Sequence, residues 1–177
     1  MDTPQNDNPA ALDPVRKETG LVSKSGFLAR RVRDLAQQAR ELNLADGLAV
    51  VFADKNLEAA VREALSKAEG PLTRGDLKRM KDLTAADKEI EDLTGLEHAV
   101  NLAKLHLTGN QISDVSPLAS LTTLTSLDLW GNQISDVSPL ASLTNLRYLN
   151  RSANPLSQES IDDHVPNFKA RGIWVYP

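Results

Sequence analysis

The sequence contains no cysteine and few aromatic residues. Phe, Trp and Tyr together make up 4% of its 177 residues. Without cysteine the chain can form neither a disulfide framework nor a thiolate metal site, and its redox compartment is left open. With so few aromatics a core must be built from other side chains, and leucine is the side chain that recurs.

The sequence also has no long apolar run and no excess of positive charge. No stretch approaches the length of a transmembrane helix, so we expect no insertion into a membrane. The formal net charge of −4 argues against a nucleic-acid ligand, because phosphate recognition needs a clustered basic surface. Residues 81–177 hold 12 acidic and 7 basic side chains, which favours a protein partner of basic character.

The first residues lack the basic-then-apolar layout of a signal peptide. This favours a cytoplasmic location. An exported or cell-surface protein is the alternative if a leader has been removed.

Fourteen consecutive residues occur twice without a change. GNQISDVSPLASLT begins at Gly109 and again at Gly131, a period of 22 residues. A tandem repeat of this length is typical of a solenoid, because each unit is too small to bury its apolar face alone. Aligning the chain at this period extends the repeat to about four turns, of which the two central ones are regular.

Each turn combines a short strand with an inward asparagine. Leu105 and Leu107 flank His106 in period 2, as a strand with one buried face requires. Strands that recur in the same sense pair in parallel. Asn132, like its equivalents in the neighbouring turns, follows the strand, where its amide can satisfy backbone groups of the turn. The sequence Ser116-Pro117 indicates the start of a short helix with Ser as its N-cap.

The pattern LxxLxLxxNxI(S)D(V)SPLxxLTxL resembles the 22-residue leucine-rich repeats of the bacterial internalin group, and it covers residues 80–156. Residues 52–77 are similar to the helical N-terminal cap of many bacterial members, and residues 154–176 to a C-terminal cap. The resemblance implies an α/β fold, a short right-handed solenoid with its parallel sheet on the concave face. It also implies a protein-recognition module and does not identify the partner.

The composition divides the chain into five parts. They are a disordered tail (1–23), an amphipathic helix (24–45), a helical N-terminal cap (46–79), the leucine-rich repeats (80–156) and an α/β C-terminal cap (157–177). In the last part we expect Pro166 to break a helix, residues 173–176 to add a final strand, and Trp174 to pack within the cap. We also expect the chain to be a monomer.

Arg151 occupies a position that is an inward leucine in the two preceding turns. A buried unpaired guanidinium is costly. We therefore expect either a distorted last strand or ion pairs with acidic groups of the cap, with Glu159, Asp162 and Asp163 as the candidates.

The residues between the inward leucines are predicted to line the concave sheet in rows, one row per strand position. Large aromatics beside charged groups have the composition of an interface hot spot. The predicted partner-binding residues are Lys104, His106, Thr108, Ser126, Asp128, Trp130, Arg147, Tyr148, Asn150 and Ser152.

An enzymatic interpretation of this face is weaker. His106 and Asp128 are expected to be neighbours, and with Ser126 they could be taken for a nucleophilic site. Ser126 lies in a different row, however, and no oxyanion loop or deep pocket is evident. The simpler interpretation is a solvated cross-strand pair. We therefore predict no enzyme activity, no cofactor and no metal site.

The sequence thus predicts a module that binds a partner protein through its concave face. The alternative is a structural or spacer segment of a larger protein, with no specific ligand of its own. The small number of regular repeats favours this alternative.

Overall fold

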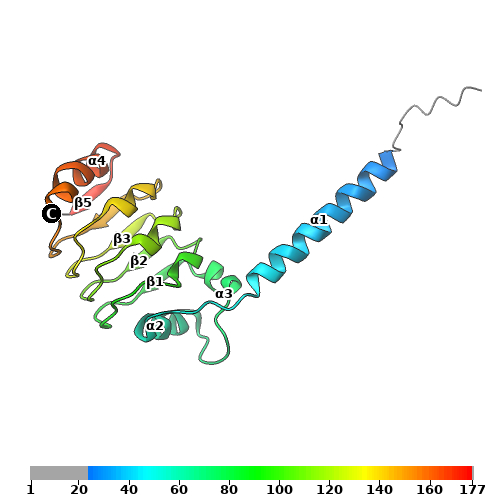
Figure 1. The fold of residues 1–177 in the computed structure, drawn as a ribbon, viewed down its shortest axis with the longest axis horizontal. Helices are drawn as coiled ribbons and strands as arrows, with labels where there is room; N and C mark the ends of the chain where they lie inside the picture. Colours follow the sequence, from blue (N-terminus) through cyan, green and yellow to red (C-terminus); the bar gives the residue numbers. More distant parts are fainter. Residues whose placement is uncertain (1–23, 177) are drawn as a thin grey trace, which may run out of the picture. The chain divides into compact units, whose positions relative to one another are not determined.

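The repeats form an open, parallel, five-stranded sheet. The computed structural model describes residues 24–176, so the predicted disordered tail of residues 1–23 lies outside the described part. The strands pair in the order β1-β2-β3-β4-β5 (Figure 1). They are β1 (Asp82–Thr84), β2 (Lys104–His106), β3 (Ser126–Asp128), β4 (Tyr148–Asn150) and β5 (Trp174–Tyr176). The predicted α/β solenoid with a parallel sheet is confirmed.

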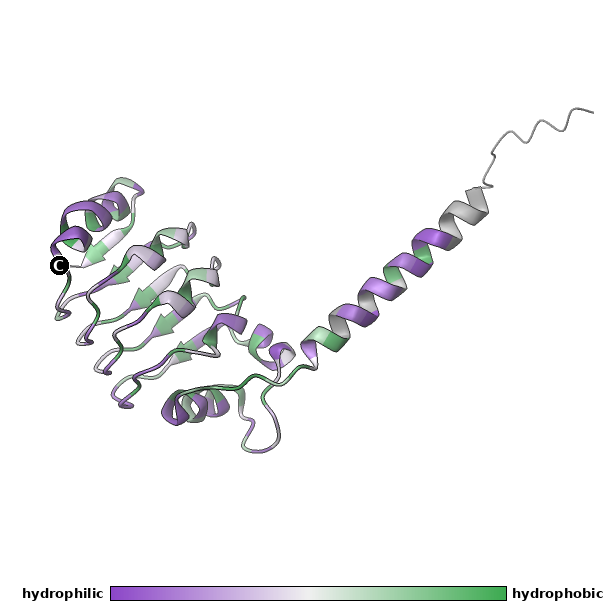
Figure 2. Cartoon of the chain, in the orientation of Figure 1, coloured by the Kyte–Doolittle hydropathy of each residue, from purple (hydrophilic) through white to green (hydrophobic). Residues whose placement is uncertain are grey.

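The central residue of every strand points into a continuous apolar core. Each is aligned with its neighbours, and none is more than 9% exposed; these residues are Leu83, Leu105, Leu127, Leu149 and Val175. On the opposite side of the core the chain returns through 3-10 turns η1 (Leu96–His98), η2 (Ser116–Ser120) and η3 (Ser138–Ser142). In Figure 2 hydrophobic segments recur in each turn of the stack. No turn has a core of its own, because each buries its leucines against the next.

The short helical turns begin differently from the prediction. Ser116 is the first residue of η2, and the preceding Val115 occupies the cap position without a side-chain hydrogen bond. The carboxylate of Asp114 accepts hydrogen bonds from the Ser116 amide and hydroxyl, both at 2.8 Å. The acceptor at this turn is therefore the aspartate of the repeat, and the expected capping role of the serine is wrong.

Buried asparagines join consecutive turns. Asn132 is 6% exposed, and its Oδ1 accepts the Ile112 amide at 3.1 Å. Its Nδ2 donates to the carbonyl oxygens of Leu107 at 2.9 Å and Leu129 at 3.0 Å. Asn110 and Asn154 bond in the same manner, each to its own turn and to the turn before it. We call these three residues the asparagine ladder.

The described N-terminal part is helical. Helix α1 runs from Lys24 to Asp46 and α2 from Lys55 to Leu65. The carboxylate of Asp54 caps α2, accepting the amides of Asn56 and Leu57 at 2.7 and 3.0 Å. Along α1 the side chains of Val32 and Leu35 are exposed, as are its arginines at positions 30, 31, 33 and 40. No described helix is long and apolar enough to cross a membrane.

The C-terminal cap is a continuous helix followed by β5. The π-helical turn η4 (Ser160–His164) runs directly into α4 (Val165–Ala170). Pro166 lies inside this continuous helix, directly after the residue that follows the π-helical turn, so the predicted break is wrong. Arg171 then holds the cap to the repeats, because its guanidinium donates to the carbonyls of Ala141 at 3.0 Å and Leu143 at 2.7 Å.

Neither expectation for Arg151, a distorted last strand or ion pairs with the cap, is met. Asn154 bonds to the carbonyls of its turn as Asn132 does, so the last repeat is not distorted. Within residues 24–176 no ion pair involves Arg151, and its buried Nε has no hydrogen-bond partner. The residue is only half-buried, which leaves part of the side chain in water.

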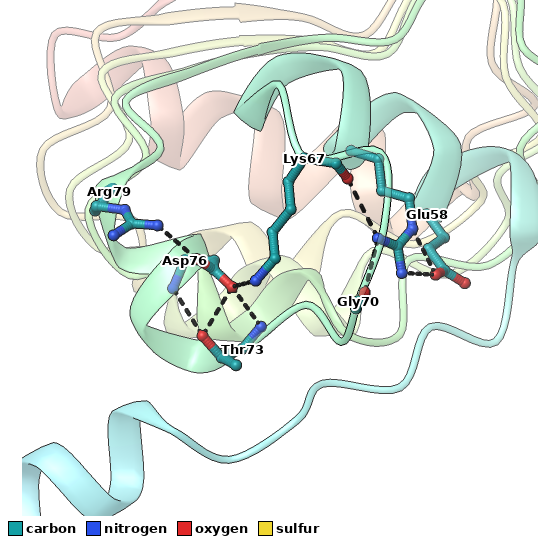
Figure 3. A network of polar contacts seen from close by, with 7 residues as sticks. Glu58, Lys67, Gly70, Thr73, Asp76 and Arg79 are labelled. Carbon is teal, nitrogen blue, oxygen red and sulfur yellow. Dashed lines mark hydrogen bonds and ion pairs between the residues drawn. The ribbon is translucent and has the colours of Figure 1, made fainter.

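A carboxylate network fixes the entry to the repeats. Helix α3 (Arg74–Arg79) begins with a capping box, in which the Thr73 hydroxyl accepts the Asp76 amide and the Asp76 carboxylate accepts the Thr73 amide. Asp76 also pairs with Lys67 at 2.6 Å and with Arg79, as Figure 3 shows. Burial raises the pKa of Asp76, but the bonds from Lys67 and Thr73 outweigh it and lower the pKa to about 2.

Replacing Asn132 by Leu removes one rung of the asparagine ladder. We expect the free energy of unfolding to fall by roughly 1–3 kcal/mol, because buried backbone groups lose their partners. Chemical denaturation measures this change, and Gln133→Leu at the exposed neighbouring position is the matched control. An Asn132→Leu protein as stable as the control would contradict the role of the ladder.

Replacing Asp76 by Asn tests the carboxylate network through its pH dependence. The folded-state pKa of about 2 lies below the unfolded value of about 3.9, so the charge stabilises the fold above pH 4 and this stability is lost as pH falls toward 2. We expect Asp76→Asn to cost about 2 kcal/mol at pH 7 and much less near pH 2. Unfolding curves at several pH values measure this, with the exposed Asp163→Asn as control. A loss that is independent of pH would mean that charge is not the cause.

Candidate partner-binding site

The strand side chains that point away from the leucine core form one surface, which we call the concave face. Strand pairing aligns these side chains across the sheet, so neighbours in a row lie about 4.8 Å apart. The first row contains Asp82, Lys104, Ser126, Tyr148 and Trp174. The second contains Thr84, His106, Asp128, Asn150 and Tyr176. The backbone hydrogen bonds Gly109 to Trp130 and Gly131 to Ser152 extend the ladder to a third row of Thr108, Trp130 and Ser152.

Nine of the ten predicted residues thus fall into these rows. Arg147 is the exception: it immediately precedes β4, its carbonyl accepts the Trp174 amide at 2.8 Å, and its side chain is exposed. It lies at the margin of the concave face. Whether any of these residues touches a partner stays a prediction.

The aromatic residues gather at the C-terminal half of this face. The chain has two Trp and two Tyr, and all four occupy concave positions. Trp130 is 47% exposed, Trp174 71% and Tyr176 51%. Tyr148, beside Trp174 in the first row, is half-buried. Four large rings on one sheet face form an exposed apolar patch of the kind that marks an interaction site.

The expected packing of Trp174 within the cap is wrong. The inward residues of this segment are Ile173 and Val175, which are 4% and 9% exposed, and Trp174 and Tyr176 alternate with them on the outer side. That alternation is visible in the sequence. It assigns both rings to the concave face once residues 173–176 are treated as a fifth strand in the same register.

The charged side chains of the face are not paired with one another. His106 and Asp128 are aligned across β2 and β3, but within residues 24–176 no hydrogen bond or ion pair joins them. No hydrogen bond links Ser126 to His106 in the described part either. The described residues also contain no group of three His, Asp or Glu that could hold a metal ion. The geometry therefore assembles no catalytic triad.

Asp128 is held in place by its own strand. One oxygen of its carboxylate accepts the Trp130 amide at 3.0 Å. In the next turn Asn150 holds the Ser152 amide in the same way, at 3.2 Å. Burial, and then the negative charge of Asp128 and the nearby Tyr176, raise the pKa of the Tyr148 hydroxyl above its ordinary value.

A hollow of about 490 Å³ lies elsewhere, along the turns that follow the strands. Its lining is polar and includes Glu91, Asp92, Gln111, Asp114 and Gln133. It has neither aromatic residues nor an apolar lining of the kind that binds small molecules. We do not assign it a ligand.

A family model for leucine-rich repeats in two copies matches residues 100–141 and 122–164. The structure is also similar to an internalin (InlF) from Listeria monocytogenes, with 32% sequence identity and a TM-score of 0.64 over 72% of this chain and 38% of that one. The chain contains internalin-like leucine-rich repeats. Its fold is typically that of a non-enzymatic scaffold, and its repeats make it a protein-interaction module in general terms.

Two further internalins of Listeria monocytogenes are similar to this chain. Internalin C2 (InlC2) has 28% identity and a TM-score of 0.50 over 71% of this chain and 64% of that one. The functional domain of InlJ, described as including a cysteine ladder, has 30% identity and a TM-score of 0.57 over 60% of this chain and 24% of that one. The chain thus spans less than two thirds of the length of each of these three proteins. A search of curated proteins gave no significant match.

Proposed function

We propose that the protein binds a partner protein through its concave face, with Trp130 and Tyr148 at the centre of the contact, and that it does so without catalysis. The observation that carries this proposal is the placement of every Trp and Tyr of the chain on one sheet face, with three of the four rings about half exposed or more. Leaving such rings in water has no structural benefit. Partner binding would bury them and supply the energy of association.

The rest of the face supports specificity. Within the repeats the 3-10 turns have identical sequences, SPLAS, in η2 and η3, whereas the concave residues differ from strand to strand. Lys104, His106, Asp128 and Arg147 provide charges of both signs around the rings. Such groups orient a partner and reject wrong ones more than they add affinity. We expect the protein to act as a monomer that offers this face to one partner at a time.

The alternative of a spacer segment makes a different prediction about the same residues. If the segment is only a spacer, truncating Trp130 and Tyr148 should not weaken binding to any partner. Truncating these two side chains therefore distinguishes partner binding from the spacer role.

The double variant Trp130→Ala, Tyr148→Ala tests the proposal. Immobilised wild-type protein is used to capture partners from a lysate of the source cell, and the affinity of the captured protein is then measured for each variant. We expect the double variant to bind at least about 30-fold more weakly, corresponding to 2 kcal/mol or more for lost hot-spot contacts. Its thermal melt should stay close to that of the wild type, because neither ring belongs to the buried core.

Ile161→Ala is the matched control, since it removes an exposed apolar side chain outside the concave face. It should bind like the wild type. Equal affinity of the double variant and the wild type would overturn the concave-face proposal, and the absence of any specific partner would favour the spacer. Substrate turnover that disappears in His106→Ala would contradict the non-enzymatic role.

A further inference from the structure

Strand β5 completes a site that the repeats alone do not form. Tyr148 is paired with Trp174 in the first row, and Asp128 lies two places from Tyr176 in the second, with Asn150 between them. Trp130 follows two residues after Asp128 on the same strand. Trp130 on the same strand and Tyr148 on the next strand therefore flank the carboxylate, and the two rings of β5 lie one strand further away. We call Asp128, Trp130, Tyr148, Trp174 and Tyr176 the aromatic–acidic patch.

No ion pair in the described part of the chain involves the charge of this patch. Within residues 24–176 no Lys, Arg or His forms an ion pair with Asp128. The residue is half-buried. Tyr148 lies on the neighbouring strand, diagonally across from Asp128. A carboxylate in this position attracts a cation more strongly than one in open solvent.

We propose that the aromatic–acidic patch binds a cationic side chain of the partner, an arginine in preference to a lysine. The proposal rests on the function proposed above and names the chemistry that the concave face recognises. A guanidinium can donate hydrogen bonds to the Asp128 carboxylate while its flat surface stacks on the neighbouring rings. The acidic character of residues 81–177, with 12 acidic and 7 basic side chains, favours the approach of such a group.

Other ligand classes fit less well. An acidic side chain would be repelled by Asp128. A neutral sugar could stack on the rings, but it would leave the carboxylate without a counter-charge. A lysine has the charge but not the planar donor surface that matches a carboxylate and a ring together.

The conservative variant Asp128→Asn removes the charge and preserves the local structure. The equivalent position of the next turn is naturally an asparagine, Asn150, whose side-chain oxygen accepts the amide of Ser152. An asparagine at 128 can therefore hold the Trp130 amide in the same way. This variant separates the effect of charge from an effect on folding.

The test is an NMR titration of the full chain that follows the indole N–H signals of Trp130 and Trp174. The probe is N-acetyl-arginine methylamide, and the neutral probe of nearly the same shape is the corresponding citrulline compound. We expect arginine to produce saturable shifts of the Trp130 indole signal and citrulline to produce much smaller ones. In Asp128→Asn the dissociation constant for arginine should rise about fivefold, as for the loss of a solvent-accessible ion pair. Asp163→Asn should leave it unchanged.

Each of the following would overturn the proposal: equal binding of arginine and citrulline, unchanged arginine binding in Asp128→Asn, or no response of the indoles to arginine. A saturable response to methyl glucoside in place of arginine would identify a sugar platform and would also overturn it. These failures are distinct from failure of the proposed function. If Trp130→Ala, Tyr148→Ala still abolishes partner binding, the concave face remains the recognition surface and only its cation chemistry is wrong.

Discussion

The hydrogen bonds of the asparagine ladder are the constraint on which the rest of the structure depends. A chain that turns inward after every strand leaves amides and carbonyls in the core that no sheet partner can reach. In three successive turns of this chain one primary amide bonds to backbone of its own turn and of the turn before it, as Asn132 does with Leu129 and Leu107. Each turn is thereby fixed to its neighbour. The leucine rows can then stack without slipping, and the concave rows inherit the same register.

That fixed register is what makes a flat sheet face usable for recognition. The side chains of the concave face come from segments 22 residues apart, yet they lie about one strand spacing from each other. Their backbone positions are set by the core and need no partner to order them. A surface prepared in this way loses little conformational entropy on binding, so the exposed rings of Trp130 and Trp174 can contribute most of their burial to affinity.

Much of this arrangement could be predicted because aligning the chain at its repeat period shows which residues occupy equivalent positions in successive turns. The spacing of Leu105, Leu127 and Leu149 fixes which residues point inward, and the register of the three central strands follows from it. The 22-residue period does not continue into the C-terminal cap. Trp174 pairs with Tyr148, 26 residues earlier, because η4 and α4 replace the short turn of a regular repeat. A 22-residue alignment therefore could not show that Trp174 and Tyr176 extend the concave rows.

The failed ion-pair expectation for Arg151 has a related origin. The sequence places Arg151 at an inward position but does not show that this end of the stack is partly open to water.

The central claim is that one face of the solenoid meets the partner and the opposite side does not. Site-specific photo-crosslinking tests it most directly, with a benzoyl-phenylalanine introduced in place of Thr108 on the concave face or of Thr144 after η3, each in the otherwise unchanged chain. The account predicts that irradiation of the complex joins the partner to the protein from position 108 and not from position 144. Crosslinking from position 144 alone would contradict it and would place recognition on the side of the 3-10 turns.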